Sequence, residues 1–250
     1  MSINVIYILW LRQIKRYFRS KARIVGSLGQ PLLFLLALGF GFGPIFQKAG
    51  QGNYIQFLTP GIIAMSILFT AIFSGIEIIW DRQFGFLKET LVAPVSRLEI
   101  MLGRTLGGAT VATLQGVIVF VLSLFVGFHI YSLIALPFAF IFMFFMALLF
   151  TALGTAIASV LKDMQGFQLI MNFLIMPIFF LSGALFPLDG LPKVIEVIAR
   201  CNPLSYGIDA LRATLSGVAH FGLLNDSIFL FIGVAVLLFV GSFLFSKIEA

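Results

Sequence analysis

The segment WDRQFGFLKETLVAPVSR, residues 80–97, places five charged residues and a proline between two long apolar stretches. No charged residue occurs from 49 to 76 before it, or from 105 to 161 after it. A helix rises about 1.5 Å per residue, so roughly 20 apolar residues cross the hydrocarbon core of a bilayer. The segment is therefore expected to be a polar connection between two membrane spans.

Composition places the whole chain among the integral membrane proteins. Of its 250 residues, 60% are hydrophobic and 10% are charged, whereas a soluble domain carries about 25% charged residues. A long apolar run can also be a buried core helix, but the sequence has no polar domain that could bury so many of them. The net charge of +6 does not indicate nucleic-acid binding, because the basic residues lie beside apolar stretches, where they orient membrane proteins.

The charge-free windows predict an all-α protein with six transmembrane helices in a single domain, 1–250. Three further windows cover 24–47, 164–188 and 227–246. The window 105–161 is too long for one helix, and HIYS at 129–132, with a proline soon after, predicts a turn inside it. The expected spans are 27–46, 57–79, 106–128, 134–160, 167–186 and 226–245.

The distribution of Lys and Arg predicts that both termini are cytoplasmic. With six spans, twelve of the sixteen Lys and Arg residues fall on the side of the termini and four on the other side. Cytoplasmic segments carry the excess of Lys and Arg. Segment 80–97 is then cytoplasmic, and Cys201, the only cysteine, faces the external side.

Residues 1–23 are predicted to form an amphipathic helix in the membrane interface, with its basic face toward anionic headgroups. A cleavable signal peptide is the alternative. It fits poorly, because the basic block follows the apolar residues and no A-x-A site follows at the right distance. The basic face and the apolar face consist, respectively, of Arg12, Lys15, Arg16, Arg19 and Arg23, and of Ile3, Ile6, Trp10, Ile14 and Tyr17.

Within 80–97, residues 84–92 predict a short helix that stops before Pro94, and Ser96 with Glu99 predicts a capping box for the next helix. A short helix at the ends of two spans suits docking into a groove on another protein. The alternative is an amphipathic loop that lies on lipid. The apolar anchors would be Phe84, Phe86 and Leu87, and the charges that select the partner would be Arg82, Lys88 and Glu89.

The connection before the last span, FPLDGLPKVIEVIARCNPLSYGIDALRATLSG at 186–217, predicts two short helices separated by an Asn-Pro pair. Neither is long enough to cross the membrane. Glu196 with Arg200 and Asp209 with Arg212 have the spacing of helical ion pairs. Both helices are expected to dip into the outer leaflet, and a solvated loop with two amphipathic helices is the alternative.

The sequence carries no motif for catalysis, nucleotide binding or metal binding. It lacks G-x-x-x-x-G-K-[ST], H-E-x-x-H and any Cys–His cluster. Carriers driven by protons usually have ionisable residues at mid-membrane. Glu77 instead is expected about one turn from the cytoplasmic end of its span, where it is either an interfacial carboxylate or a functional residue. The chain is therefore not expected to be an enzyme or to hold a cofactor, and its energy source should lie outside the chain.

Two stretches resemble the permease subunits of type-2 ABC exporters, with the daunorubicin-resistance and nodulation-factor export permeases as the closest branch. They are DRQFGFLKETLVAPVSR after the second span and FLSGALFPLDGLPKVIEVIARCNPLSYGIDALR after the fifth, and the similarity covers nearly the whole chain. The resemblance implies two permeases and two separate cytoplasmic ATPase subunits, which bind ATP and Mg. It also implies export of an amphipathic or lipid-like substrate across a cell membrane, the prokaryotic inner (plasma) membrane.

The functional segments of this family carry over by motif. In the family, spans 2 and 5 line the translocation path near the dimer axis, and the outer loop closes it. The coupling segment within 80–97 contains Asp81, Arg82, Phe84, Gly85, Phe86, Leu87, Lys88, Glu89 and Pro94. The outer re-entrant segment, 187–217, contains Pro187, Pro192, Glu196, Arg200, Asn202, Pro203, Asp209 and Arg212.

Polar residues at helical spacing form one predicted stripe on each of these two spans. Polar side chains that face lipid are disfavoured, so each stripe should line the path or form hydrogen bonds between helices. Small residues at 108, 112 and 116 on the third span are assigned to helix packing. The stripes are Ser66, Thr70 and Ser74 on span 2, and Gln165, Gln168 and Asn172 on span 5.

Several alternatives stay open at this point. A channel or secondary carrier with no ATPase partner is the main rival, and a membrane scaffold without transport is another. A drug, a lipid, a glycolipid or a lipid-linked oligosaccharide would each suit an apolar path. The second permease is either another copy of this chain or a related one.

Overall fold

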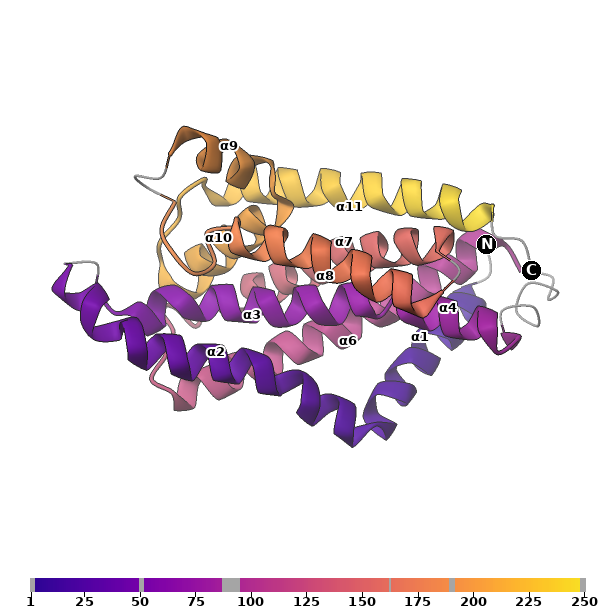
Figure 1. Ribbon diagram of the computed structural model, residues 1–250, viewed down its shortest axis with the longest axis horizontal. Helices are drawn as coiled ribbons and strands as arrows, with labels where there is room; N and C mark the ends of the chain where they lie inside the picture. Colours follow the sequence, from indigo (N-terminus) through magenta and orange to yellow (C-terminus); the bar gives the residue numbers. More distant parts are fainter. Residues whose placement is uncertain (1–2, 50–51, 87–94, 162, 189–191, 248–250) are drawn as a thin grey trace.

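The computed structural model describes residues 3–49, 52–86, 95–161, 163–188 and 192–247, in which all regular structure is helical. In Figure 1 the long helices run along the length of the molecule. The start of α1 and the end of α11 lie at one end, called here the terminal end, while α9 and α10 lie at the opposite, hairpin end. The helices are α1 (Ile3–Arg19), α2 (Lys21–Lys48), α3 (Tyr54–Phe73), α4 (Ile76–Gln83), α6 (Arg97–Phe125), α7 (Leu136–Val160), α8 (Met164–Phe180), α9 (Lys193–Cys201), α10 (Pro203–Ser216) and α11 (Leu223–Ser246).

Five stretches of the described chain are long and apolar enough to cross a membrane: α2, α3 with α4, α6, α7 and α11. The predicted fifth span corresponds to α8, which is apolar but has only 17 residues. It ends at Phe180 rather than near 186, because the chain turns there and Gly183 takes φ +74, a left-handed conformation that ends helices. The protein is therefore a multi-pass helical membrane protein.

The N-terminal helix is shorter than predicted. It ends at Arg19, and Ser20 leaves the helical conformation with φ −100 and ψ 77 before α2 begins at Lys21. Arg23 consequently belongs to α2, and the first span begins six residues before the predicted position, 27. In Figure 1 this elbow between α1 and α2 stands away from the rest of the bundle.

The centre of the fold is α3, which contacts α2, α6, α7, α8 and α10. In the apolar part of its span, 72% of the residues are buried within the protein. The corresponding shares are 17% for α2 and 22% for α11. A helix that is apolar all round is stable when protein or lipid surrounds it. The outer helices α2 and α11 thus keep much of their surface for lipid or for partners, as does the exposed face of α8.

Glycine allows the closest helix contact in the bundle core. At Gly154 of α7, an added Cβ would lie 2.9 Å from Ile72 Cα and still closer to the Ile72 carbonyl oxygen. A Cβ on Gly75, between α3 and α4, would likewise meet the Gly154 carbonyl. Backbone meets backbone here, so no flexible side chain can move aside.

Gly154→Ala is expected to destabilise the protein by about 1–3 kcal/mol, because overpacking a tight core forces the backbones apart. The matched control is Gly41→Ala on α2, where an added Cβ meets nothing within 4 Å. That control should be neutral or slightly stabilising, because alanine favours a helix over glycine. Melting temperatures of the purified variants in detergent test the prediction, and equal melting temperatures would contradict it.

The capping box before the third span is confirmed. Ser96 Oγ accepts a hydrogen bond from Glu99 N, and Glu99 Oε2 accepts one from Ser96 N, both at 3.2 Å. The predicted turn at 129–132 is confirmed as well, because it lies between the end of α6 and the start of α7. The packing role of Gly108 and Gly116 is also confirmed, since Ser74 and Thr151 lie directly against Gly108 and Ile67 of α3 lies directly against Gly116.

Candidate functional site

The buried carboxylate of Glu77 on α4 lies between two arginines at the terminal end. Arg23 Nη1 of α2 donates to Glu77 Oε1 at 2.9 Å, and Arg16 Nη1 of α1 lies 3.6 Å from Glu77 Oε2. Two guanidinium groups therefore share one carboxylate. Glu77 thus connects the elbow between α1 and α2 to the part of the second span nearest the terminal end.

One helical turn further on, Asp81 makes the second set of ion pairs. Arg104 of α6 donates to Asp81 Oδ2, and Arg12 Nη2 of α1 donates to Asp81 Oδ1 at 3.3 Å. The side chains of Asp81 and Arg104 are 7% and 4% exposed. The two acids and four arginines are called here the inner ion-pair cluster, which joins α1, α2, α4 and α6: Arg12, Arg16, Arg23, Glu77, Asp81 and Arg104.

The opposite side of α1 is fixed to α6 by hydrogen bonds. Trp10 Nε1 donates to Thr110 Oγ1 at 3.0 Å, and the Tyr17 hydroxyl donates to Gln115 Oε1 at 2.5 Å. Burial raises the pKa of Tyr17 further above neutral pH, and its protonated phenol is the donor. The predicted apolar face of α1 thus contacts protein at these two residues, and α1 is attached to the bundle on two sides.

Asp81 and Arg82, two of the predicted coupling residues, point into the protein. Asp81 belongs to the inner ion-pair cluster. Arg82 donates from Nη1 to Leu161 O at 2.9 Å and from Nη2 to Ser159 O at 3.1 Å. These carbonyls belong to the end of α7, where helices leave acceptors unsatisfied. Both residues therefore connect α4 to other helices, Asp81 to α1 and α6 and Arg82 to the end of α7.

The residues that follow turn outward. The predicted helix 84–92 is wrong at its start, because Phe84 caps the C-terminus of α4 and Gly85 takes φ +82, a left-handed conformation that helices do not continue through. Phe84 and Phe86 are 72% and 51% exposed. The remaining predicted coupling residues lie outside the described residues: Leu87, Lys88, Glu89 and Pro94.

The exposed phenylalanines line an open groove of about 790 Å³ between α1 and α4, called here the α1–α4 groove. One wall is basic and the other is aromatic, with α1 supplying the charges. Such a surface fits a partner that offers both acidic and apolar side chains. The basic residues are Arg12, Lys15, Arg16 and Arg19, and the aromatic ones are Trp80, Phe84 and Phe86.

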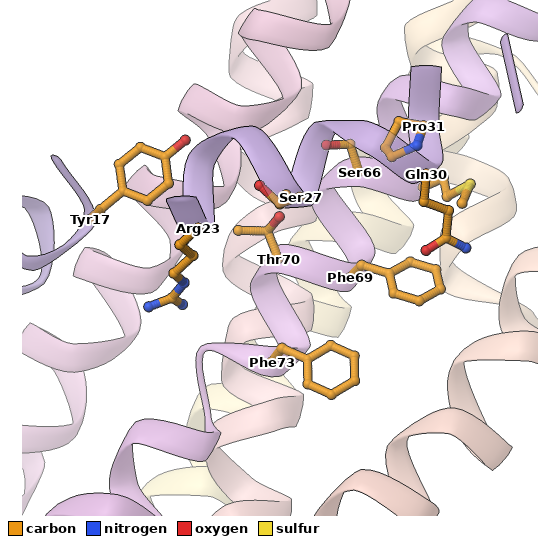
Figure 2. Close-up of a pocket in the computed structure, with 11 residues that line it drawn as sticks. Tyr17, Arg23, Ser27, Gln30, Pro31, Ser66, Phe69, Thr70 and Phe73 are labelled. Carbon is orange, nitrogen blue, oxygen red and sulfur yellow. The ribbon is translucent and has the colours of Figure 1, made fainter. Parts of the chain in front are cut away.

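A second, smaller cavity of about 220 Å³ lies between α2 and α3 and is called here the α2–α3 cleft. Ser66 and Thr70, two members of the predicted stripe on span 2, line it (Figure 2). Ser74 does not. Its hydroxyl donates to Ala71 O at 2.6 Å and lies against Gly108 of α6, because each four-residue step rotates a side chain by about 40° around the helix.

The predicted stripe on span 5 lies on the open face of α8. Its members are exposed, while the opposite face of the helix is buried. One of the buried residues, Phe167, packs edge-on against Phe73 of α3, with ring centroids 6.4 Å apart. The two stripes therefore lie in different environments, and the exposed one consists of Gln165, Gln168 and Asn172.

At the hairpin end, the two predicted short helices are present as α9 and α10. The Glu196–Arg200 pair is confirmed, with Arg200 Nη2 2.7 Å from Glu196 Oε1. Asn202 Oδ1 accepts from Leu204 N at 3.0 Å, and its Nδ2 donates to Ile178 O of α8 at 2.6 Å. Asn202 thus starts α10 and fixes it to α8. The prolines of the motif precede or begin elements: Pro187 after α8, Pro192 before α9 and Pro203 at the first position of α10.

The predicted ion pair between Asp209 and Arg212 is wrong. Asp209 accepts hydrogen bonds from His220 N and Phe221 N, at 2.8 and 2.7 Å, in the turn before α11. Arg212 instead donates to Gly183 O at 3.1 Å and lies over the ring of Phe57, 4.0 Å from its centroid. Burial lowers the pKa of Arg212 to about 10, so the guanidinium is still charged near neutral pH. Each of the two charged side chains bonds to backbone groups of another segment. A buried backbone group without a hydrogen-bond partner destabilises the fold, so its bond to a charged side chain is favourable.

The role of Arg104 was missed, because the sequence predicts it only as one of the residues that orient the chain. A signal for its role was available. Arg104 lies two turns inside α6, at a depth where a buried charge needs a partner. Asp81 is the acid at the end of the preceding span, and its pairing with Arg104 was therefore open to inference.

Comparison with known proteins assigns the family. The description ABC-2 type transporter matches residues 4–216. The chain is 32% identical over 213 residues to nodulation protein J of Rhizobium leguminosarum bv. trifolii, which covers 84% of this chain and 78% of that protein. It is 30% identical over 217 residues to the putative transport permease ycf38 of Cyanophora paradoxa, covering 84% and 73%, and 33% identical over 228 residues to that of Pyropia yezoensis, covering 86% and 75%. On this evidence the chain belongs to the ABC-2 type transporter family and is a transport permease.

Proposed function

We propose that this chain is the transmembrane permease subunit of an ATP-driven exporter, and that it moves an amphipathic or lipid-like substrate out of the cytoplasm. Family membership implies an ABC ATPase partner. ATP and Mg would bind to that partner, two copies of which would serve two permeases. The terminal end would then face the cytoplasm of a prokaryotic cell.

The observation that carries the proposal is the connection between the α1–α4 groove and the spans. The exposed rings of Phe84 and Phe86 follow directly on Asp81 and Arg82, which are bonded to α6 and to the end of α7. A partner that moves the exposed rings would therefore displace α4 together with α6 and α7, to which it is bonded. Energetic coupling between the partner's binding site and the spans needs a structural element whose position both influence. α4 is a candidate, because the exposed rings of Phe84 and Phe86 follow its end and it is bonded to other helices through Asp81 and Arg82.

The open face of α8 supports a second permease beside this one. Gln165, Gln168 and Asn172 are exposed there, and polar side chains are disfavoured against lipid. A second copy of this chain, or a related permease, would cover this face and leave a path between the two proteins. α9 and α10 would close the outer end of that path.

Transport in inside-out membrane vesicles tests the energy source. ATP should drive uptake of a fluorescent amphipathic probe, and uptake should persist when an uncoupler collapses the proton gradient. Uptake without ATP that the uncoupler abolishes would instead identify a secondary carrier. Uptake without ATP or any gradient would identify a channel.

The orientation of the chain is tested at Cys201, which is the only cysteine and is exposed at the end of α9. An impermeant maleimide is expected to label it in intact cells, because six spans with both ends inside place the hairpin end outside. The matched control is a Cys201→Ser variant with Ser2→Cys at the N-terminal end. That control should react only after the membrane is opened, and the reverse pattern would contradict the orientation.

A further inference from the structure

The α2–α3 cleft lies beside α2, the least buried of the five candidate spans. Its walls are residues 23–31 of α2 and 65–73 of α3, which correspond to about 12 Å of each helix. The α2 span is only 17% buried, so a ligand that is dissolved in the bilayer can reach the cleft sideways. A volume of about 220 Å³ accommodates a headgroup rather than a whole lipid.

Three hydroxyl groups line this cleft, those of Ser27, Ser66 and Thr70 (Figure 2). The Ser27 hydroxyl donates to Ile24 O of its own helix at 3.0 Å, so toward a ligand it can act only as an acceptor. Ser66 is 2% exposed, and its Oγ has no hydrogen-bond partner within the described chain. Pro31, also in the lining, has no N–H to donate to the Ser27 carbonyl one turn earlier. The cleft thus contains a buried hydroxyl without a partner, Ser66 Oγ, and a buried polar atom of this kind is available to bond a ligand.

The end of the cleft nearest the terminal end is positively charged. Arg23 lines it, and the only carboxylate it pairs with among the described residues, Glu77, also pairs with Arg16. Two positive charges against one negative charge leave one unit of charge uncompensated. Basic pockets between helices on the cytoplasmic side of a membrane attract anionic headgroups.

We propose that the α2–α3 cleft binds the headgroup of an anionic, hydroxyl-bearing membrane lipid. The phosphate lies near Arg23, and the hydroxyl groups of the headgroup bond to Ser27, Ser66 and Thr70. The acyl chains remain in the bilayer. The lipid either stays bound to the permease, as a resident lipid, or is the substrate that the permease exports, as cargo. Only the second case rests on the proposed function.

The test compares two glycines of α2. Gly26 lines the cleft, whereas Gly29 does not, and an added Cβ meets nothing within 4 Å at either position. A leucine side chain at 26 is therefore expected to occupy part of the cleft, and leucine at 29 is its matched control. The probes are phosphatidylglycerol and phosphatidylcholine, added to the purified permease in detergent. A ligand that binds only the folded state raises the melting temperature.

Phosphatidylglycerol should raise the melting temperature of the wild type and of Gly29→Leu more than phosphatidylcholine does. Gly26→Leu should lose this difference. Ser66→Ala should weaken phosphatidylglycerol binding by up to about tenfold, because its hydrogen bond to a hydroxyl group of the headgroup is lost. Equal responses of Gly26→Leu and Gly29→Leu, or no preference for phosphatidylglycerol in the wild type, would overturn the proposal.

Transport separates the two sources of the lipid. If the lipid is cargo, Gly26→Leu should also abolish export of a fluorescent phosphatidylglycerol analogue, and Gly29→Leu should not. If it is a resident lipid, export of other amphipathic probes should continue in Gly26→Leu. Failure of the wild type to export any probe would count against the proposed function, while the melting-temperature result would still decide the lipid site.

Discussion

Asp81→Ala is expected to lower the stability of the permease by about 3–5 kcal/mol, because it leaves the buried Arg104 without its carboxylate. The side chains of Asp81 and Arg104 are 7% and 4% exposed, so water cannot take the place of the lost partner. Arg104→Met should cost a similar amount. Unfolding in increasing concentrations of sodium dodecyl sulfate, with the amount of protein in the membrane as a second measure, tests both variants.

Two controls separate charge burial from general damage. The double variant Asp81→Leu with Arg104→Met should recover most of the lost stability, because well-packed apolar groups often replace a buried ion pair at little cost. Arg12→Gln should cost less than about 1 kcal/mol, because the Arg12 side chain is 43% exposed and such pairs are weak. An equally small effect of Asp81→Ala and Arg12→Gln would show that the inner ion-pair cluster does not hold the helices together.

Phe86→Ala should weaken retention of the ATPase about 30-fold without changing membrane abundance. A central aromatic anchor at an interface typically contributes about 2 kcal/mol or more, and Phe86 is 51% exposed in this chain. Transport should fall more than the ATPase activity of the isolated partner subunits. Glu89→Arg is expected to act in the same direction by placing an unpaired or like charge at the contact.

Phe125→Ala is the matched control for Phe86→Ala. Phe125 is 84% exposed at the other end of the bundle, where α6 ends, so its loss should leave ATPase retention unchanged. If instead segment 80–97 only lies on lipid, Phe86→Ala would merely loosen the loop, and both variants would keep full retention and export. That outcome would reject the coupling assignment.

Apolar runs, turns and caps were predictable from the sequence, because they depend on neighbouring residues. The capping box of Ser96 and Glu99, the turn at 129–132 and the start of α10 at Asn202-Pro203 are all local, and the structure confirms them. The break at Ser20 was not predictable, because Arg23 keeps the helical spacing of the basic face although it belongs to α2.

Charged residues show the same limit. The spacing of Glu196 and Arg200 predicted their pair correctly, since both side chains lie on the exposed surface of α9. The spacing of Asp209 and Arg212 predicted a pair that does not form, because α10 is buried and unpaired backbone groups from other segments compete for both side chains. The partners of Asp81 and Arg104 likewise depend on helix packing. The spacing of opposite charges along one helix therefore predicts ion pairs well at the surface and poorly in the interior.

The central claim is that an ATPase powers this permease through its terminal end. Purification of the tagged chain from its native membrane, followed by identification of the proteins that remain bound, tests this claim most directly. We predict a P-loop ATPase in a one-to-one ratio with the permease in the wild type and in Phe125→Ala, and a strongly reduced amount in Phe86→Ala. A fully folded, transport-competent permease that purifies with no P-loop ATPase would contradict the account.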